Sequence, residues 1–146
     1  NAIKHFYREV LGMRQRIDIK FAKRSKKLPV VLSREEIQTL LATITNAKHK
    51  LMIALAYGAG LRVSEIINLR VPDVLVDELT LHIKEAKGKK DRITLIPEKL
   101  ANDLRALIAG KEHDDILFAS ERGGKLSERT AQKVFEHALQ KAEIKK

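Results

Sequence analysis

The chain has 146 residues, enough for one compact domain with its own hydrophobic core and too few for two full ones. Its 29 lysines and arginines outnumber 19 acidic residues, and the net charge of +10 favours a polyanionic partner such as nucleic acid. The absence of cysteine excludes disulfides, thiolate chemistry and cysteine zinc sites, and no apolar run is long enough to cross a bilayer, so we expect a soluble cytoplasmic protein without a membrane partner.

The amino-terminal residues carry most of the excess charge. Residues 1–28 hold nine basic and two acidic side chains. Apolar residues recur at helical spacing as far as Leu11, and the stretch from Arg14 to Pro29 is rich in charge and ends at a proline. This pattern predicts a short helix followed by a basic linker, with a solvated strand or arm as the alternative for the second part.

Three helices are predicted between Ser33 and Leu69. The first begins with an S-x-x-E capping box, Ser33 and Glu36, followed by one apolar stripe. The second, over residues 48–57, is apolar on most sides, so we expect it to lie in the core, to pack Tyr57 there, and to end at the following glycines. The third, over residues 63–69, is expected to stop before a proline.

The pattern then changes to the period of a strand. Residues 79–84 alternate between apolar and polar, and a second strand-like run, residues 92–96, follows a lysine-rich turn around Gly88. This predicts an antiparallel hairpin with a basic tip. Pro97 opens a further helix and Ser127 a last one, so the expected fold class is α+β, mainly helical with a small antiparallel sheet.

Arg62 and Glu65 are three residues apart at the start of the third helix, hence on one helical face. Two interpretations are open from the residues alone. The pair could be structural, an arginine held by a nearby carboxylate. Alternatively, Glu65 could hold a guanidinium whose planar fork is presented to a phosphate.

Two motifs in a fixed order resemble one known family. GLRVSEIINL is followed, 25 residues after Arg62, by Lys87 in the turn KGKKDRITLIP. Together they resemble the catalytic domain of the tyrosine recombinases, the phage integrase family, in its Xer and integron integrase branch. The resemblance runs from about Leu28 to the end and includes LPVVLSREEI and ILFAS. It implies that residues 1–28 are the last helix and linker of a preceding DNA-clamping domain and that residues 29–146 are the amino-terminal part of the catalytic domain.

The resemblance implies roles for individual residues. Arg62 matches the first catalytic arginine, Glu65 the acidic residue that orients it, and Lys87 the hairpin lysine, a candidate general acid. The neighbouring basic residues and the start of the last helix are expected to bind DNA phosphates: Lys26, Lys27, Lys84, Lys89, Lys90, Arg92, Ser127, Arg129, Thr130 and Lys133. A plain capping role is the alternative for Ser127.

The sequence also departs from the family. The H-x-x-R motif, a further His or Trp and the nucleophilic tyrosine are expected after this region and are missing. A literal HFYR occurs at His5 to Arg8, but it precedes Arg62 and lies in an apolar stripe. We therefore reject it as the family's H-x-x-R motif, and we reject Tyr7 as the nucleophile. We therefore expect a truncated domain that binds double-stranded DNA and cannot cleave it.

The resemblance also implies the partners. The parent recombinase would cut and rejoin DNA through a 3′-phosphotyrosine without metal, ATP or another cofactor, as a tetramer on DNA, whereas this piece would be monomeric or weakly associated. Scattered histidines disfavour a metal site.

The alternative function is a non-catalytic DNA-binding regulator or recombinase relic. An RNA-binding protein is disfavoured because only 4% of the residues are aromatic.

Overall fold

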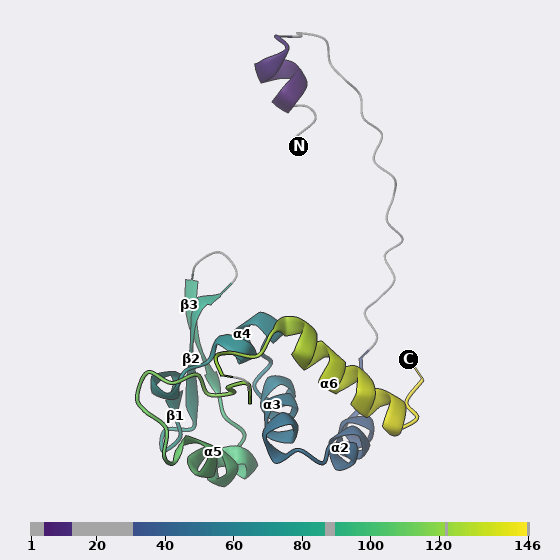
Figure 1. Cartoon of the computed structure of the whole chain (residues 1–146), viewed down its shortest axis with the longest axis vertical. Helices are drawn as coiled ribbons and strands as arrows, with labels where there is room; N and C mark the ends of the chain where they lie inside the picture. Colours follow the sequence, from purple (N-terminus) through teal and green to yellow (C-terminus); the bar gives the residue numbers. More distant parts are fainter. Residues whose placement is uncertain (1–4, 13–30, 87–89, 122, 146) are drawn as a thin grey trace. The chain divides into compact units, whose positions relative to one another are not determined.

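The computed structural model describes residues 5–12, 31–86, 90–121 and 123–145 (Figure 1). The chain divides into two compact units, residues 1–30 and 31–146. In the first unit the described element is a single π-helical turn, η1 (Phe6–Val10), where the exposed ring of Phe6 meets Tyr7 edge-on at 5.7 Å. The predicted basic linker lies outside the described residues.

The second unit is mainly helical with a three-stranded antiparallel sheet in the order β1-β2-β3, so the predicted fold class is confirmed. Its elements are α2 (Arg34–Thr43), α3 (Ala47–Gly58), α4 (Val63–Asn68), η2 (Val71–Asp73), β1 (Val74–Leu75), β2 (Thr80–Ala86), β3 (Lys90–Leu95), η3 (Glu98–Leu100), α5 (Ala101–Ile108) and α6 (Glu128–Lys141). The two-residue strand β1 was not predicted from the sequence, and the helix expected after Pro97 begins as the 3-10 turn η3. No described helix has the length and apolar character needed to span a bilayer.

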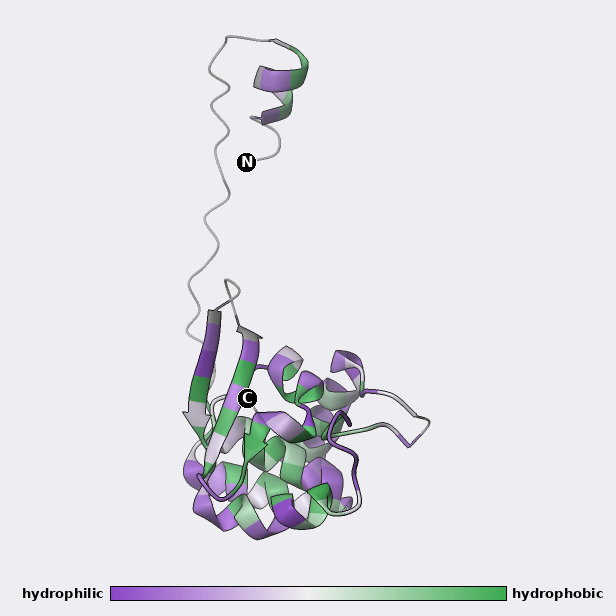
Figure 2. Cartoon of the chain, turned by 90° about the vertical axis from the view of Figure 1, so that its left-hand side faces the viewer, coloured by the Kyte–Doolittle hydropathy of each residue, from purple (hydrophilic) through white to green (hydrophobic). Residues whose placement is uncertain are grey.

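The core lies between the sheet and the helices (Figures 1 and 2). α3 contributes Leu51, Met52 and Leu55, and the inner face of β2 contributes Leu81 and Ile83. The segment between α5 and α6 adds two fully buried side chains, Leu117 and Phe118. Figure 2 shows the sheet at one side of the unit, with the helices packed behind it.

Local capping signals are confirmed at two helices. The Ser33 hydroxyl accepts a hydrogen bond from the Glu36 backbone N–H at 3.2 Å, and the Glu36 carboxylate accepts one from the Ser33 N–H at 2.7 Å. The Ser127 hydroxyl accepts one from the Thr130 N–H at 3.1 Å, at the start of α6. Each of these bonds satisfies a helix-terminal N–H that has no partner within its own helix.

The expectation that Tyr57 packs in the core is wrong, because its side chain is 51% exposed. Tyr57 follows the buried Leu55 by two residues, which places it about 200° around the helix and therefore on the opposite side. α3 is buried on one side only at this end.

α3 ends in a Schellman motif that sets the direction of the chain into α4. The Leu61 N–H donates to the Ala56 carbonyl at 2.9 Å, and the Gly60 N–H donates to the Tyr57 carbonyl at 3.4 Å. Gly60 has a φ of +63°, the left-handed conformation that this motif needs and that glycine adopts without a Cβ clash. Arg62 follows directly.

Replacing Gly58 by alanine is expected to destabilise the fold, although alanine favours a helix over glycine by about 0.8–1 kcal/mol. An added Cβ would lie 2.5 Å from Pro97 Cγ, too close for two carbon atoms. We expect a loss of about 1–3 kcal/mol in the free energy of unfolding, measured by chemical denaturation. Adding Pro97→Ala removes the clashing ring and should recover much of the loss; strictly additive effects of the two substitutions would contradict this explanation.

Candidate functional site

Arg62 directly follows the Schellman motif and lies at the start of α4. It occupies the N-cap position with an extended backbone, φ −74° and ψ 157°. Arginine has no acceptor atom, so its side chain cannot cap the helix as serine or asparagine would. The guanidinium is instead turned to an acidic side chain, and the Arg62 side chain as a whole remains 56% exposed.

Glu65 lies between two arginines. Its Oε1 is 2.7 Å from Arg62 Nη1, and its Oε2 accepts hydrogen bonds from the Arg62 backbone N–H at 2.7 Å and from Arg92 Nη2 at 2.8 Å. Only 6% of the Glu65 side chain is exposed. One carboxylate faces two guanidiniums, so the cluster keeps a net charge of +1 next to solvent, which favours a bound anion.

The second arginine comes from the sheet. Arg92 Nη2 is also 3.3 Å from the Gly60 carbonyl oxygen, and the Thr94 hydroxyl donates to the Ala59 carbonyl at 2.9 Å. The cluster defined by Arg62, Glu65 and Arg92 therefore joins the turn between α3 and α4 to β3. We call it the Glu65 cluster.

The pKa of Glu65 is lowered in the folded protein. Burial by itself raises the pKa of this carboxyl, but hydrogen bonds from the Arg62 backbone and side chain, and then the contact with Arg92, outweigh burial and lower it. The carboxylate is therefore ionised at neutral pH, as two ion pairs require.

This shift predicts a pH dependence of stability. Because the pKa of Glu65 in the folded state lies below its ordinary value of 4.5, the unfolded chain takes up the proton first as the pH falls. The contribution of Glu65 is present above about pH 4.5 and is lost as the pH falls through the folded pKa. In denaturation curves at several pH values, the stability difference between the wild type and Glu65→Gln should shrink on acidification; a constant difference would refute the shift.

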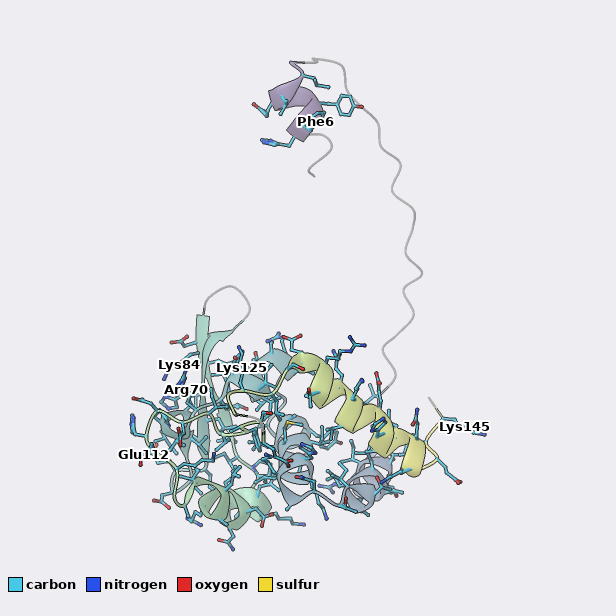
Figure 3. The ribbon with its side chains drawn as sticks, in the orientation of Figure 1. Phe6, Arg70, Lys84, Glu112, Lys125 and Lys145 are labelled. Atoms are coloured by element: carbon cyan, nitrogen blue, oxygen red, sulfur yellow. The ribbon has the colours of Figure 1, made fainter. Side chains whose placement is uncertain are left out.

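Two other basic residues, Lys84 and Lys125, lie beside the strands of the hairpin and α4 (Figure 3). The ammonium of Lys84 on β2 lies 2.6 Å from Oδ1 of the buried Asp73. The two groups form an ion pair, but their geometry is not that of a hydrogen bond. Lys125 donates to the side-chain oxygen of Asn68 at 2.9 Å, at the end of α4. Sequence reasoning missed Lys125 and Asp73, because their partners are 57 and 11 residues away.

The start of α6 presents a second group of predicted site residues. Arg129, Thr130 and Lys133 are exposed, and the structure gives neither basic side chain an ion pair within the described residues. The Ser127 hydroxyl contacts the Thr130 N–H and Oγ1, so the capping role expected as an alternative is present. α4 and the start of α6 are neighbours in Figure 1.

Several predicted residues cannot be placed. Lys26, Lys27, Lys87 and Lys89 lie outside the described residues, and the description of Lys90 extends only to its backbone at the start of β3. Among residues 5–12, 31–86, 90–121 and 123–145, no group of three histidine, aspartate or glutamate side chains could hold a metal ion.

A model of one protein family matches most of the chain. It is described as the phage integrase family and covers residues 30–146. The chain belongs to this family of tyrosine recombinases. The motif around Arg62 and the hairpin that follows it lie within the matched region, and the expected family is confirmed.

Curated relatives agree with this assignment. The chain is 37% identical over 125 residues to tyrosine recombinase XerA of Thermococcus kodakarensis, covering 82% of this chain and 44% of that protein. It is 43% identical over 81 residues to an integrase/recombinase of Escherichia coli, covering 56% of this chain and 24% of that protein. The chain thus spans less than half the length of these relatives.

Solved structures show the same fold. The XerA recombinase crystal structure superposes with a TM-score of 0.72 at 29% identity, over 99% of this chain and 53% of that one. XerH site-specific recombinase, solved bound to difH substrate in a pre-cleavage complex, superposes with a TM-score of 0.66 at 23% identity, over 86% of this chain and 40% of that one. The second similarity shows the fold alone.

Proposed function

We propose that this chain binds double-stranded DNA as part of a site-specific recombinase and supplies Arg62, Glu65 and Lys87 to its strand-cleaving site. The observation that carries the proposal is the Glu65 cluster, in which a half-exposed guanidinium is held by a buried carboxylate and a net charge of +1 is left over. Family membership over residues 30–146 supports it, as does the 37% identity to tyrosine recombinase XerA over 82% of this chain.

The proposed chemistry uses no metal or other cofactor. A tyrosine hydroxyl loses its proton to water and attacks the phosphorus in line, a phosphorus–oxygen bond forms to tyrosine, and the bond to the leaving 5′ oxygen breaks. Negative charge grows on the nonbridging oxygens, where the Arg62 guanidinium can donate two hydrogen bonds. Lys87 donates a proton to the leaving oxygen, which requires its pKa to lie below the ordinary value of about 10.4.

The 146 residues alone are proposed to bind DNA without cutting it. Tyr7 and Tyr57 both precede Arg62, and neither matches the family's nucleophile. We propose that residues 1–28 end a preceding DNA-clamping domain, that residues 29–146 are the amino-terminal part of the catalytic domain, and that the protein acts in the cytoplasm. The whole recombinase would assemble as a tetramer on DNA, with this piece monomeric or weakly associated.

Duplex binding by this chain is the first test. The logarithm of the binding constant should fall linearly with the logarithm of the salt concentration, with a slope of about −0.9 for each phosphate that the protein neutralises. Replacing Lys133 at the exposed start of α6 by glutamine should reduce that slope by about 1. A matched control is Arg105→Gln, which removes the same charge from α5, a helix that lies away from α4 and the start of α6 (Figure 1). Equal effects of the two substitutions would contradict DNA binding at the start of α6.

The absence of cleavage is tested separately. The chain is incubated with duplex DNA and the mixture is separated under denaturing conditions. No covalent protein–DNA adduct is expected, and its detection would refute the assignment of the nucleophile to residues outside this chain.

A further inference from the structure

Strand β3 has an inverted pattern of exposure. Its apolar side chains, Ile93 and Leu95, are 65% and 69% exposed, whereas Arg92 and Thr94 between them face inward and are half-buried. A strand with one buried face normally turns its apolar residues to the core and its polar residues to water. The inversion therefore indicates that the polar side chains have partners on the inner side.

Those partners are the turn that precedes Arg62 and the carboxylate of Glu65 on α4. Thr94 donates to the Ala59 carbonyl at 2.9 Å, and Arg92 reaches the Gly60 carbonyl at 3.3 Å and Glu65 Oε2 at 2.8 Å. Both arginine contacts use one nitrogen, Nη2. The inner face of β3 is thus fixed to the α3–α4 turn and to Glu65 at the same time.

We propose that Arg92 is a positioning residue that acts through Glu65 on Arg62, rather than a contact to the DNA backbone. The role assigned to Arg62 rests on the proposed function, whereas the coupling between the two arginines does not. Because β3 directly follows the hairpin turn that contains Lys87, the same contact ties this strand of the hairpin to the carboxylate that holds Arg62.

The geometry of the carboxylate explains how the coupling works. Glu65 Oε2 receives two donors, the Arg62 backbone N–H and Arg92 Nη2, which together fix the rotation of the carboxylate group. Oε1 is then aimed at Arg62 Nη1. Removing Arg92 leaves a single donor on Oε2, so the carboxylate can rotate and Arg62 loses its fixed partner.

Exposure separates the two arginines. The Arg62 side chain is 56% exposed and that of Arg92 is 34% exposed. Arg92 has its Nη2 committed to two acceptors and lies on the inner face of the sheet, whereas Arg62 has only Nη1 bound to Glu65. Of the two arginines, Arg62 therefore presents more of its side chain to solvent, whereas Arg92 is held between the α3–α4 turn and Glu65.

The test is an NMR measurement on the whole chain without DNA, so it is independent of the proposed function. Two quantities are followed in the wild type, Arg92→Gln and Arg92→Lys: the titration midpoint of the Glu65 carboxyl carbon, and the protection of the Arg62 guanidinium protons from exchange with water. Arg92→Gln should shift the Glu65 midpoint upward, because one positive donor is gone, and should abolish the protection at Arg62. Arg92→Lys should restore both, because the native contact uses one nitrogen that an ammonium can replace.

The matched control is Arg105→Gln, which breaks another arginine–carboxylate pair of 2.8 Å, to the exposed Asp77. It should leave the Glu65 midpoint and the Arg62 protection unchanged. The proposal is overturned if Arg92→Gln behaves like this control. If Arg92→Gln does not fold, Arg92→Met, which keeps an unbranched side chain and lacks the donor, takes its place: a raised Glu65 midpoint with an unprotected Arg62 supports the proposal, and wild-type values overturn it.

Discussion

Replacing Arg62 by alanine is expected to lower the rate of DNA strand cleavage about 10²–10³-fold in a cleavage-competent protein that contains these residues. Arg62 is the more exposed arginine of the Glu65 cluster, and the fixed position of its guanidinium avoids reorganisation as charge develops on the phosphate. Alanine removes this stabilisation of the transition state. The rate should be measured in single-turnover experiments with saturating enzyme, so that weaker binding does not enter the result.

Duplex affinity is the companion measurement. Arg62 is one of several exposed basic residues proposed to contact DNA, with Arg129 and Lys133 among them, so its removal should cost far less in binding than in cleavage. This contrast separates a recombinase from the alternative, a non-catalytic DNA-binding regulator or relic, in which the substitution would lower affinity modestly and change nothing else. A cleavage rate that falls only in proportion to affinity would contradict the catalytic assignment.

Replacing Phe118 by alanine is expected to lower the free energy of unfolding by about 3–5 kcal/mol. Phe118 is 0% exposed and lies in the core cluster, in a segment whose Leu117 N–H donates to the Leu69 carbonyl at 2.8 Å. The loss combines the transfer energy of the ring with the cavity left behind. Because this segment is hydrogen-bonded to Leu69, the residue directly after α4, the cavity is also expected to destabilise α4, which carries Glu65.

Phe135 on α6 provides the matched control. It is only half-buried, so Phe135→Ala removes the same atoms but leaves a space that water can enter, and the loss should be smaller. Both variants should be compared by denaturant unfolding at neutral pH. Equal losses would show that Phe118 is not the better-packed ring.

Much of the fold followed from local patterns. The capping box at Ser33 depends on atoms within one helical turn, and the alternation of residues 79–84 depends on the pleat of a single strand, so neighbouring residues were enough to predict both. Glu65 was assigned to Arg62 for the same reason, since residues three apart on a helix share a face. Fold class and family were therefore within reach of the sequence.

The predictions that failed or were missed depend on contacts across the chain. Tyr57 was expected inside because its helix is apolar, but the direction from which the core meets α3 is set by elements that come later in the sequence. The strand β1 has two residues and no pattern of its own; it exists because Val74 and Leu75 pair with Leu81 and Thr80 on β2.

The sequence by itself determined which residues form the helices and the hairpin, and that Arg62 and Glu65 form a pair, because those outcomes rest on interactions a few residues long. Only the tertiary structure decided that Arg92, 27 residues after Glu65, faces inward and contacts the same carboxylate. The inverted exposure of β3 makes physical sense only when the α3–α4 turn lies against it. An ion pair between distant residues forms only when the two backbone segments that carry them are already packed together, so no local sequence pattern predicts it.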